Sequence, residues 1–354
     1  MQAYFRYVKF ILQLCKAKMK ACESRRDLKE NFINCRSATK KIKQTNKKMQ
    51  SIIQTLIQEI KKKKTLSKLD DKIVETKLNT LLNQNPKTKK LISSEENYEK
   101  IKKSKLVKEI IKQTRNDFNI IYGQFQSKEP KHTNKLLEQL KKELNSTNLT
   151  EQNILELHNN LLKTHLSTKE RIKDQEKIIK EIIVELNKNK TRETDSLNIL
   201  DLACGFNPFS IPFWLNITKI KKISYTCSDF TKQDQEIIEN YFKILSNKYN
   251  ELKGESIQLD ISKPDSENHK IFSKKYDFAL IWKTLDLIDH KQAENFINKI
   301  DSDLIIISFS TVTVKNRRMN VKKRSWLHKL LRRLNLKYEI KEYSNELFYF
   351  IEKK

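Results

Sequence analysis

The chain has 354 residues, which is long enough for two domains of ordinary size. Its 72 Lys and Arg outnumber 44 Asp and Glu, and the formal net charge of +28 favours a polyanionic partner, because each neutralised phosphate releases condensed counterions. No stretch approaches the roughly 20 apolar residues of a membrane span, so neither a membrane association nor a signal peptide is expected. The five cysteines form no C-x-x-C pair, which argues against a metal site or disulfide framework and favours the reducing cytoplasm.

The N-terminal region, residues 1–60, is expected to be an extension of the folded chain. Residues 1–48 have little periodicity and are either genuine or an upstream misreading with Met49 as the start. Apolar residues then recur at helical spacing, and Ser93–Glu96 form a capping-box pattern that predicts the start of one helix. We therefore expect an all-α domain over 61–190.

The hydrophobic period changes after a polar linker at 187–196, and this change predicts a second domain over 191–354. Short β-rich runs there alternate with helical stretches, as in a mainly parallel sheet. The expected strands are 197–202, 222–228, 255–260, 277–282, 303–309, 336–342 and 346–351. The last two are joined by a short turn, which places the final strand antiparallel. This order predicts an α/β fold, the seven-strand, Rossmann-like class I methyltransferase domain.

The loop after the first expected strand carries an acid and a glycine, Asp201 and Gly205. A glycine there lets the backbone approach a ligand at the carboxyl edge of the sheet. Dinucleotide binding would need G-x-G-x-x-G, whereas one glycine suffices beside the methionine part of S-adenosylmethionine. A plain strand–turn–helix is the alternative interpretation.

The next two expected strands also end in acids. Asp229 stands where an acid binds ribose hydroxyls, and Asp260 with Ile261 fits an acid and an apolar contact for adenine. Each acid alone fits a helix N-cap equally well. Three consecutive strands ending in Asp favour an S-adenosylmethionine-dependent methyltransferase.

The kind of methyl acceptor is narrowed by absent motifs. Residues 279–286 lack the D/N-P-P-Y motif of exocyclic-amine methyltransferases, and no cysteine follows the fourth or fifth strand to attack a pyrimidine carbon. Guanine N7 is an attractive target because its lone pair needs only alignment with the methyl group, without a general base. The product is cationic, so excess positive charge at the ring should be avoided.

A local basic segment, residues 315–337, contains ten Lys and Arg and no acid, while the other residues of 191–354 carry a net negative charge. Codon bias would not confine lysine and arginine to one segment, so this one predicts an anion-binding surface. The expected RNA ligands are Lys315, Arg317, Arg318, Lys322, Lys323 and Arg324.

Five motifs in order carry a family resemblance: His165–Arg171, Asp201–Pro208, Leu280–Leu285, Ile307–Phe309 and Asn345–Ile351. Together they resemble the 16S rRNA (guanine-N7) methyltransferases of the aminoglycoside-resistance group, over roughly residues 70–354. The pair H-x-S-T-x-E-R and D-x-A-C-G-x-N-P is fairly specific for this group.

The resemblance implies roles for particular residues. Arg171 would contact the cofactor carboxylate, and Lys283 would lie near the transfer site as the catalytic residue. The cofactor site would contain Arg171, Asp201, Gly205, Asp229, Asp260 and Ile261. The helical domain and the basic loop would hold 16S rRNA of the small ribosomal subunit, with a decoding-site guanine as the target and a monomer as the active form.

The sequence departs from this family on the substrate side. Ser310 replaces a proline, and Val314–Met319 is shorter than the family loop and lacks its glycines, so another guanine or another RNA is an open alternative. Ser167–Glu170 also fits a capping box, with Arg171 merely solvated. Other open alternatives are a methyltransferase acting on a protein and an inactive RNA-binding protein with this fold.

Overall fold

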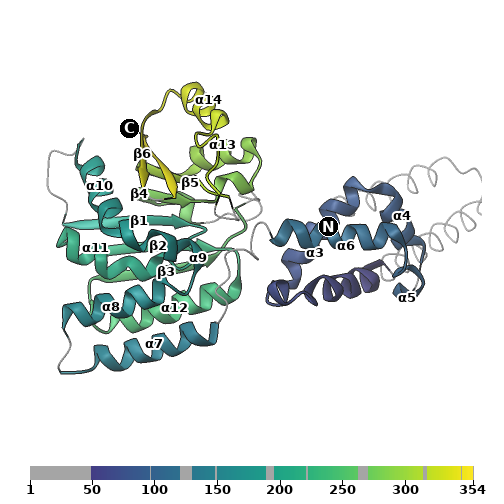
Figure 1. Ribbon diagram of the computed structural model, residues 1–354, viewed down its shortest axis with the longest axis horizontal. Helices are drawn as coiled ribbons and strands as arrows, with labels where there is room; N and C mark the ends of the chain where they lie inside the picture. The colour runs from purple at the N-terminus through teal and green to yellow at the C-terminus, as the bar shows by residue number, and fades with distance from the viewer. Residues whose placement is uncertain are drawn as a thin grey trace, which may run out of the picture. The chain divides into compact units, whose positions relative to one another are not determined.

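A computed structural model describes residues 49–95, 97–119, 130–147, 150–188, 195–220, 222–261, 270–313, 317–343 and 345–353. The chain divides into two compact units between Asp117 and Phe118 (Figure 1). The sheet and the helices that cover it form the second unit. The predicted boundary near residue 190 therefore differs from the boundary between compact units.

The first unit is helical. Residues 49–61 form a helix, which is followed by η1 (Lys64–Leu66), α3 (Asp71–Gln84), α4 (Pro86–Ser94), α5 (Tyr98–Ile101) and α6 (Lys105–Phe118). Leu56, Ile57 and Ile60 are fully buried, so part of the expected extension belongs to this core. Burial of this apolar stripe stabilises the helix against the others.

The predicted capping box at Ser93–Glu96 is wrong. Ser93 and Ser94 lie in the last turn of α4, where their hydroxyls donate to backbone carbonyls of the same helix at 2.9 and 3.0 Å. Pro86 favours the earlier start of α4, because proline suits the first helical turn. The next helix is instead capped by Asn97, whose side chain accepts from the Glu99 N–H.

Four helical segments precede the sheet within the second unit. These are α7 (Pro130–Leu144), α8 (Glu151–Leu162), α9 (Leu166–Arg171) with the 3-10 turn η3 (Ile172–Asp174), and α10 (Gln175–Asn187). Leu137, Leu161 and Ile179 are fully buried in the same core as sheet residues. These helices therefore share the hydrophobic core of the sheet, which explains where the compact unit begins.

The sheet has seven strands in the order β3-β2-β1-β4-β5-β7-β6. Their bounds are β1 (Ser196–Leu202), β2 (Lys222–Asp229), β3 (Leu252–Gln258), β4 (Lys275–Trp282), β5 (Asp301–Ser310), β6 (Lys337–Tyr343) and β7 (Glu346–Glu352). β7 runs antiparallel to both neighbours, and the pairs among β1 to β5 are parallel. The predicted class I methyltransferase fold is confirmed.

Helical segments connect the strands and cover the sheet (Figure 1). They are η4 (Asn207–Ser210), α11 (Ile211–Thr218), α12 (Lys232–Ser246), η5 (Lys270–Ser273), η6 (Leu285–Leu287), α13 (His290–Lys299) and α14 (Ser325–Arg333). Alternating side chains of the strands enter two apolar clusters, with Phe278 in one and Ala279 in the other. Because parallel strands end at one edge, the loops after β1, β2, β4 and β5 meet there.

Candidate active site

The loop after β1 is joined to the end of β2 by a hydrogen bond from a backbone N–H to the Asp229 carboxylate. The Gly205 N–H donates to Oδ2 of Asp229 at 2.7 Å, and the Phe230 N–H donates to Oδ1 at 2.6 Å. Gly205 has φ +52° and Ala203 has φ +51°, which are left-handed conformations. The structure thus brings together Gly205 and Asp229, two of the predicted cofactor residues.

His165 packs against this glycine. A Cβ atom at Gly205 would lie 2.8 Å from Cε1 of His165, so only glycine fits without movement. The ring is held by a 2.8 Å hydrogen bond between Nδ1 and Ser167 Oγ. Burial, and then the charges of Arg171 and Lys283, lower the pKa of His165 to about 3, so its imidazole is neutral. The sequence motif contained His165, but the sequence analysis gave it no role.

Asp201 braces the same loop from inside. Its Oδ2 accepts from the Tyr225 hydroxyl at 2.6 Å and from Asn207 Nδ2 at 2.8 Å. Burial raises the pKa of Asp201 to about 6, although these hydrogen bonds oppose the shift. Asp201 therefore orders the loop after β1 through Tyr225 and Asn207, two partners that were not predicted from the sequence.

The third predicted acid lies beyond its strand. β3 ends at Gln258, so Asp260 lies two residues after the strand, and the expected strand 255–260 was displaced along the chain. The Leu259 N–H donates to the Asp229 carbonyl at 2.9 Å, which keeps this turn beside the end of β2. Asp260 is partly buried and Ile261 is buried. Both remain near the predicted cofactor edge.

Arg171 is buried, with only 4% of the residue exposed. Its Nη1 lies 3.2 Å from Oε1 of Glu346, and its guanidinium lies 4.6 Å above the ring of Trp282. The alternative with a solvated arginine is therefore wrong. The capping box predicted at Ser167–Glu170 is also absent. The N-cap position of α9 is His165, whose side chain makes no capping hydrogen bond, and Thr168 Oγ1 donates to backbone carbonyls.

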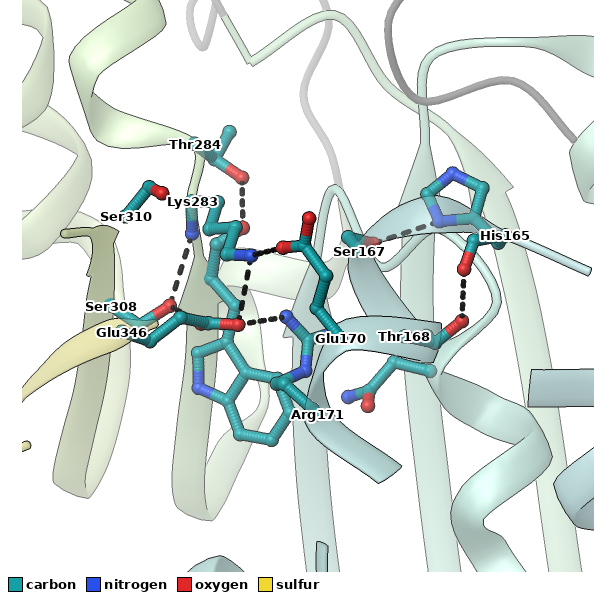
Figure 2. A network of polar contacts seen from close by, with 12 residues as sticks. His165, Ser167, Thr168, Glu170, Arg171, Lys283, Thr284, Ser308, Ser310 and Glu346 are labelled. Atoms are coloured by element: carbon teal, nitrogen blue, oxygen red, sulfur yellow. Dashed lines mark hydrogen bonds and ion pairs between the residues drawn. The ribbon is translucent and has the colours of Figure 1, made fainter. Parts of the chain in front are cut away.

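Lys283 lies at the end of β4 in a network of polar contacts (Figure 2). Its Nζ lies 3.0 Å from Oε1 of Glu346 and also contacts Glu170. Its φ of +56° is uncommon for a lysine and costs about 1–2 kcal/mol. Such strain persists where the surroundings fix the conformation, and it is typical of functional sites.

Glu346 connects both cations of this network. Its Oε2 accepts from Ser308 Oγ at 2.7 Å, and the residue is 2% exposed. Burial raises the pKa of this carboxyl, but Arg171 and Lys283 outweigh burial and hold it below its usual value. Glu346 was not predicted; its only signal in the sequence was membership of the Asn345–Ile351 motif.

Some of the side chains predicted to bind RNA are exposed, and others are paired with acidic side chains of the protein. Arg317, Arg318 and Lys323 are exposed. Lys322 pairs with Glu342 at 2.6 Å. Arg324 makes a multidentate contact with Asp286, 2.7 Å from Nη2 to Oδ2, and lies above the ring of Phe309. Lys315 lies outside the described residues.

The part of the chain that the structure describes holds no cluster of three or more His, Cys, Asp or Glu side chains suited to a metal ion. Within those residues, too, every helix is too short or too polar to span a bilayer.

Comparison with known proteins identifies the family of the chain. No curated protein matches the chain. Among solved structures, that of the 16S rRNA methylase ArmA is 21% identical, and the match covers 61% of this chain and 97% of the ArmA chain, with a TM-score of 0.42. Magnesium protoporphyrin IX methyltransferase ChlM from Synechocystis PCC 6803, with bound SAH, is 13% identical over 53% and 87% of the chains, with a TM-score of 0.37. The family described as ribosomal RNA methyltransferase (FmrO) matches residues 101–346, more than half of the chain. This match confirms the resemblance found in the sequence, and the chain belongs to the FmrO family of ribosomal RNA methyltransferases.

Proposed function

We propose that the protein transfers a methyl group from S-adenosylmethionine to N7 of a guanine in the decoding-site helix of 16S rRNA. The family supports ribosomal RNA methylation. The observation that carries the choice of N7 is the charge-balanced network around Lys283. Methylation of this helix in the small ribosomal subunit would protect the cell from aminoglycosides. The enzyme would act as a cytoplasmic monomer.

The carboxyl-edge residues fit the cofactor. Nε of Arg171 is a buried donor without a partner among the described residues, and it suits a carboxylate. The Asp229 carboxylate accepts from backbone N–H groups that include those of Gly205 and Phe230, and its remaining lone pairs suit ribose hydroxyls. Asp260 and Ile261 would contact adenine, and Gly205 would lie beside the methionine part. When bound, S-adenosylmethionine supplies an electrophilic methyl group.

The network around Lys283 suits a reaction that creates a cation. Arg171 and Lys283 are balanced by Glu170 and Glu346, so the four formal charges sum to zero. An uncompensated ammonium would repel a developing positive charge on guanine. N7 needs no general base, and Lys283, whose ammonium contacts two carboxylates, need only align the acceptor.

Carbon methylation through a cysteine is disfavoured by the described thiols. Cys204 and Cys227 are both buried, in the first loop and in β2. Burial raises the pKa of the Cys204 thiol well above its usual value, so a thiolate nucleophile is not available there.

The exposed cations of the basic segment would hold phosphates. Arg317, Arg318 and Lys323 follow β5, whose carboxyl end lies at the same sheet edge as Lys283. Contacts to phosphates fix register without reading sequence, and the bases of the target helix would be read elsewhere.

Methyl transfer to isolated small ribosomal subunits tests the proposal. The subunits are incubated with labelled S-adenosylmethionine, and their RNA is then treated with borohydride and aniline, which cleave it at N7-methylguanine. The Asp229→Ala variant is the inactive control. One cleavage in the decoding-site helix supports the proposal. Label without that cleavage removes the N7 target, and no label on subunits, naked rRNA or tRNA despite cofactor binding contradicts RNA as the substrate. Absence of cofactor binding would favour an inactive RNA-binding protein.

A further inference from the structure

Glu346 is the first residue of β7 and lies at the centre of the network in Figure 2. We infer that Glu346 is a positioning residue that fixes Lys283 at both its ammonium and its backbone. The inference rests on the proposed function only in that it gives Lys283 a place beside the transfer site.

The register of the sheet brings Glu346 to this place. β5 and β7 pair so that Ser310 lies opposite Glu346, and Ser308 is two residues away on the same face. β4 and β5 pair so that Trp282 lies opposite Ser308, and Lys283 follows directly. Two strand pairings thus place Glu346, Ser308 and Lys283 side by side.

The two carboxylate oxygens of Glu346 serve the two ends of Lys283. Oε1 lies 3.0 Å from Nζ and holds the ammonium. Oε2 accepts from Ser308 Oγ at 2.7 Å, and the same Oγ accepts from the Lys283 N–H at 3.2 Å. The Ser308 carbonyl also accepts from that N–H, at 2.9 Å. Glu346 therefore reaches the left-handed backbone of Lys283 through one serine.

Glu170 provides a matched comparison. It contacts the same ammonium, but its side chain is 31% exposed, and its contact does not involve the Lys283 backbone. Removing either carboxylate changes the formal charge of the network by the same amount. If Glu346 only balances charge, both changes should have equal effects; if it positions Lys283, its loss should be much more harmful.

The first test compares Glu346→Gln, Glu170→Gln and a control, Glu339→Gln, an exposed carboxylate of β6 that pairs with Lys188. Methyl transfer to small ribosomal subunits is measured with S-adenosylmethionine affinity by calorimetry. We expect kcat to fall about 100-fold for Glu346→Gln, since misplacement by an ångström costs this much. Cofactor affinity is measured beside kcat because Glu346 also pairs with Arg171, so that a loss of cofactor binding is separated from a loss in kcat. Glu170→Gln should lose a few-fold at most, and Glu339→Gln should behave as wild type.

A charge-neutral variant guards against misfolding of Glu346→Gln. Ser308→Ala leaves the network's charges in place and removes the link from Glu346 to the Lys283 backbone. We expect kcat to fall about 10-fold, as for loss of one buried hydrogen bond. Equal losses in Glu346→Gln and Glu170→Gln, or an unchanged Ser308→Ala enzyme, would overturn the inference.

A second readout needs no substrate. The Lys283 side chain is 7% exposed, so acetic anhydride should spare it in the wild type and in Glu339→Gln. Mass spectrometry should find Lys283 acetylated in Glu346→Gln but still protected in Ser308→Ala, where Nζ keeps both carboxylates. Continued protection of Lys283 in Glu346→Gln would contradict the inference that Glu346 holds the ammonium. If the wild type methylates a site other than guanine N7, the proposed function fails. The kcat values of the variants relative to wild type and the acetylation of Lys283 still decide the role of Glu346.

Discussion

The substitution Gly205→Ala tests whether His165 shapes the loop after β1. Gly205 has φ +52°, and a left-handed alanine costs about 1–2 kcal/mol. The new Cβ would also lie 2.8 Å from Cε1, 3.2 Å from Nδ1 and 3.3 Å from Nε2 of His165, so the ring must move. The ring is held by Ser167 and lies 5.4 Å from the ring of Phe206, between centroids.

Overpacking of this kind typically costs about 1–3 kcal/mol. We therefore expect Gly205→Ala to lower the free energy of unfolding by about 2–5 kcal/mol, the sum of backbone strain and overpacking. In a His165→Ala background the second part disappears, and only about 1–2 kcal/mol should remain. Cofactor affinity should fall with Gly205→Ala as well, because the Gly205 N–H donates to Asp229.

Urea unfolding of wild type, both single variants and the double variant forms a complete cycle. The two substitutions should couple by about 1–3 kcal/mol, the overpacking part, which is above the roughly 0.5 kcal/mol expected for independent sites. If Gly205→Ala costs the same in both backgrounds, His165 does not shape the loop, and backbone strain alone explains the glycine.

Three further predictions concern separate parts of the chain. Asp229→Ala should abolish S-adenosylmethionine binding in calorimetry and spare RNA binding; equal losses of both would remove Asp229 from the cofactor site. The double variant Arg317→Glu/Arg318→Glu should weaken RNA binding and reduce the magnitude of the slope of log affinity against log salt by about 2, with cofactor affinity unchanged. An unaltered slope would contradict phosphate contacts by these two arginines. Burial lowers the pKa of His158 from 6.5 to about 4, so the stability it contributes is complete above pH 6.5 and is lost as the pH falls towards 4. Urea titrations should show about 3 kcal/mol of acid destabilisation that His158→Gln lacks, and parallel pH profiles for the two proteins would disprove it.

The strand order was predictable because the central strands are buried on both faces. Leu304–Ile307 reads as an apolar run, and Leu197–Leu202 is apolar apart from Asn198 and Asp201. Helices between such strands imply parallel pairing. β3 is an edge strand whose residues 253–255 are exposed, so its pattern was weak and the predicted strand slipped towards Asp260. Gly254 adds to this, because its missing side chain makes room for the ring of Phe242.

The contact between Gly205 and Asp229 could be predicted from the sequence, whereas the network around Lys283 and Glu346 could not. Gly205 lies in the loop after β1 and Asp229 ends the neighbouring parallel strand β2, so their proximity follows from topology. The pairing of Arg171 with Glu346 joins residues 175 positions apart and depends on the β5–β7 register. Hydrophobic periodicity gives the presence of β7 but not its register, which is why Glu346 was missed.

The basic segment shows that charge in a sequence does not by itself identify a phosphate ligand. Arg324 precedes α14 and holds the Asp286 carboxylate from Nε and Nη2, while its guanidinium covers Phe309. Turning this arginine towards RNA would leave Asp286 without its partner, so its present contacts oppose a phosphate role. Arg317 and Arg318 differ, because the Arg317 carbonyl accepts from the Thr313 N–H at 2.8 Å and Arg318 bridges to Val312. Their backbones are fixed while their side chains stay exposed, and this arrangement favours them over Arg324 as contacts for RNA phosphates.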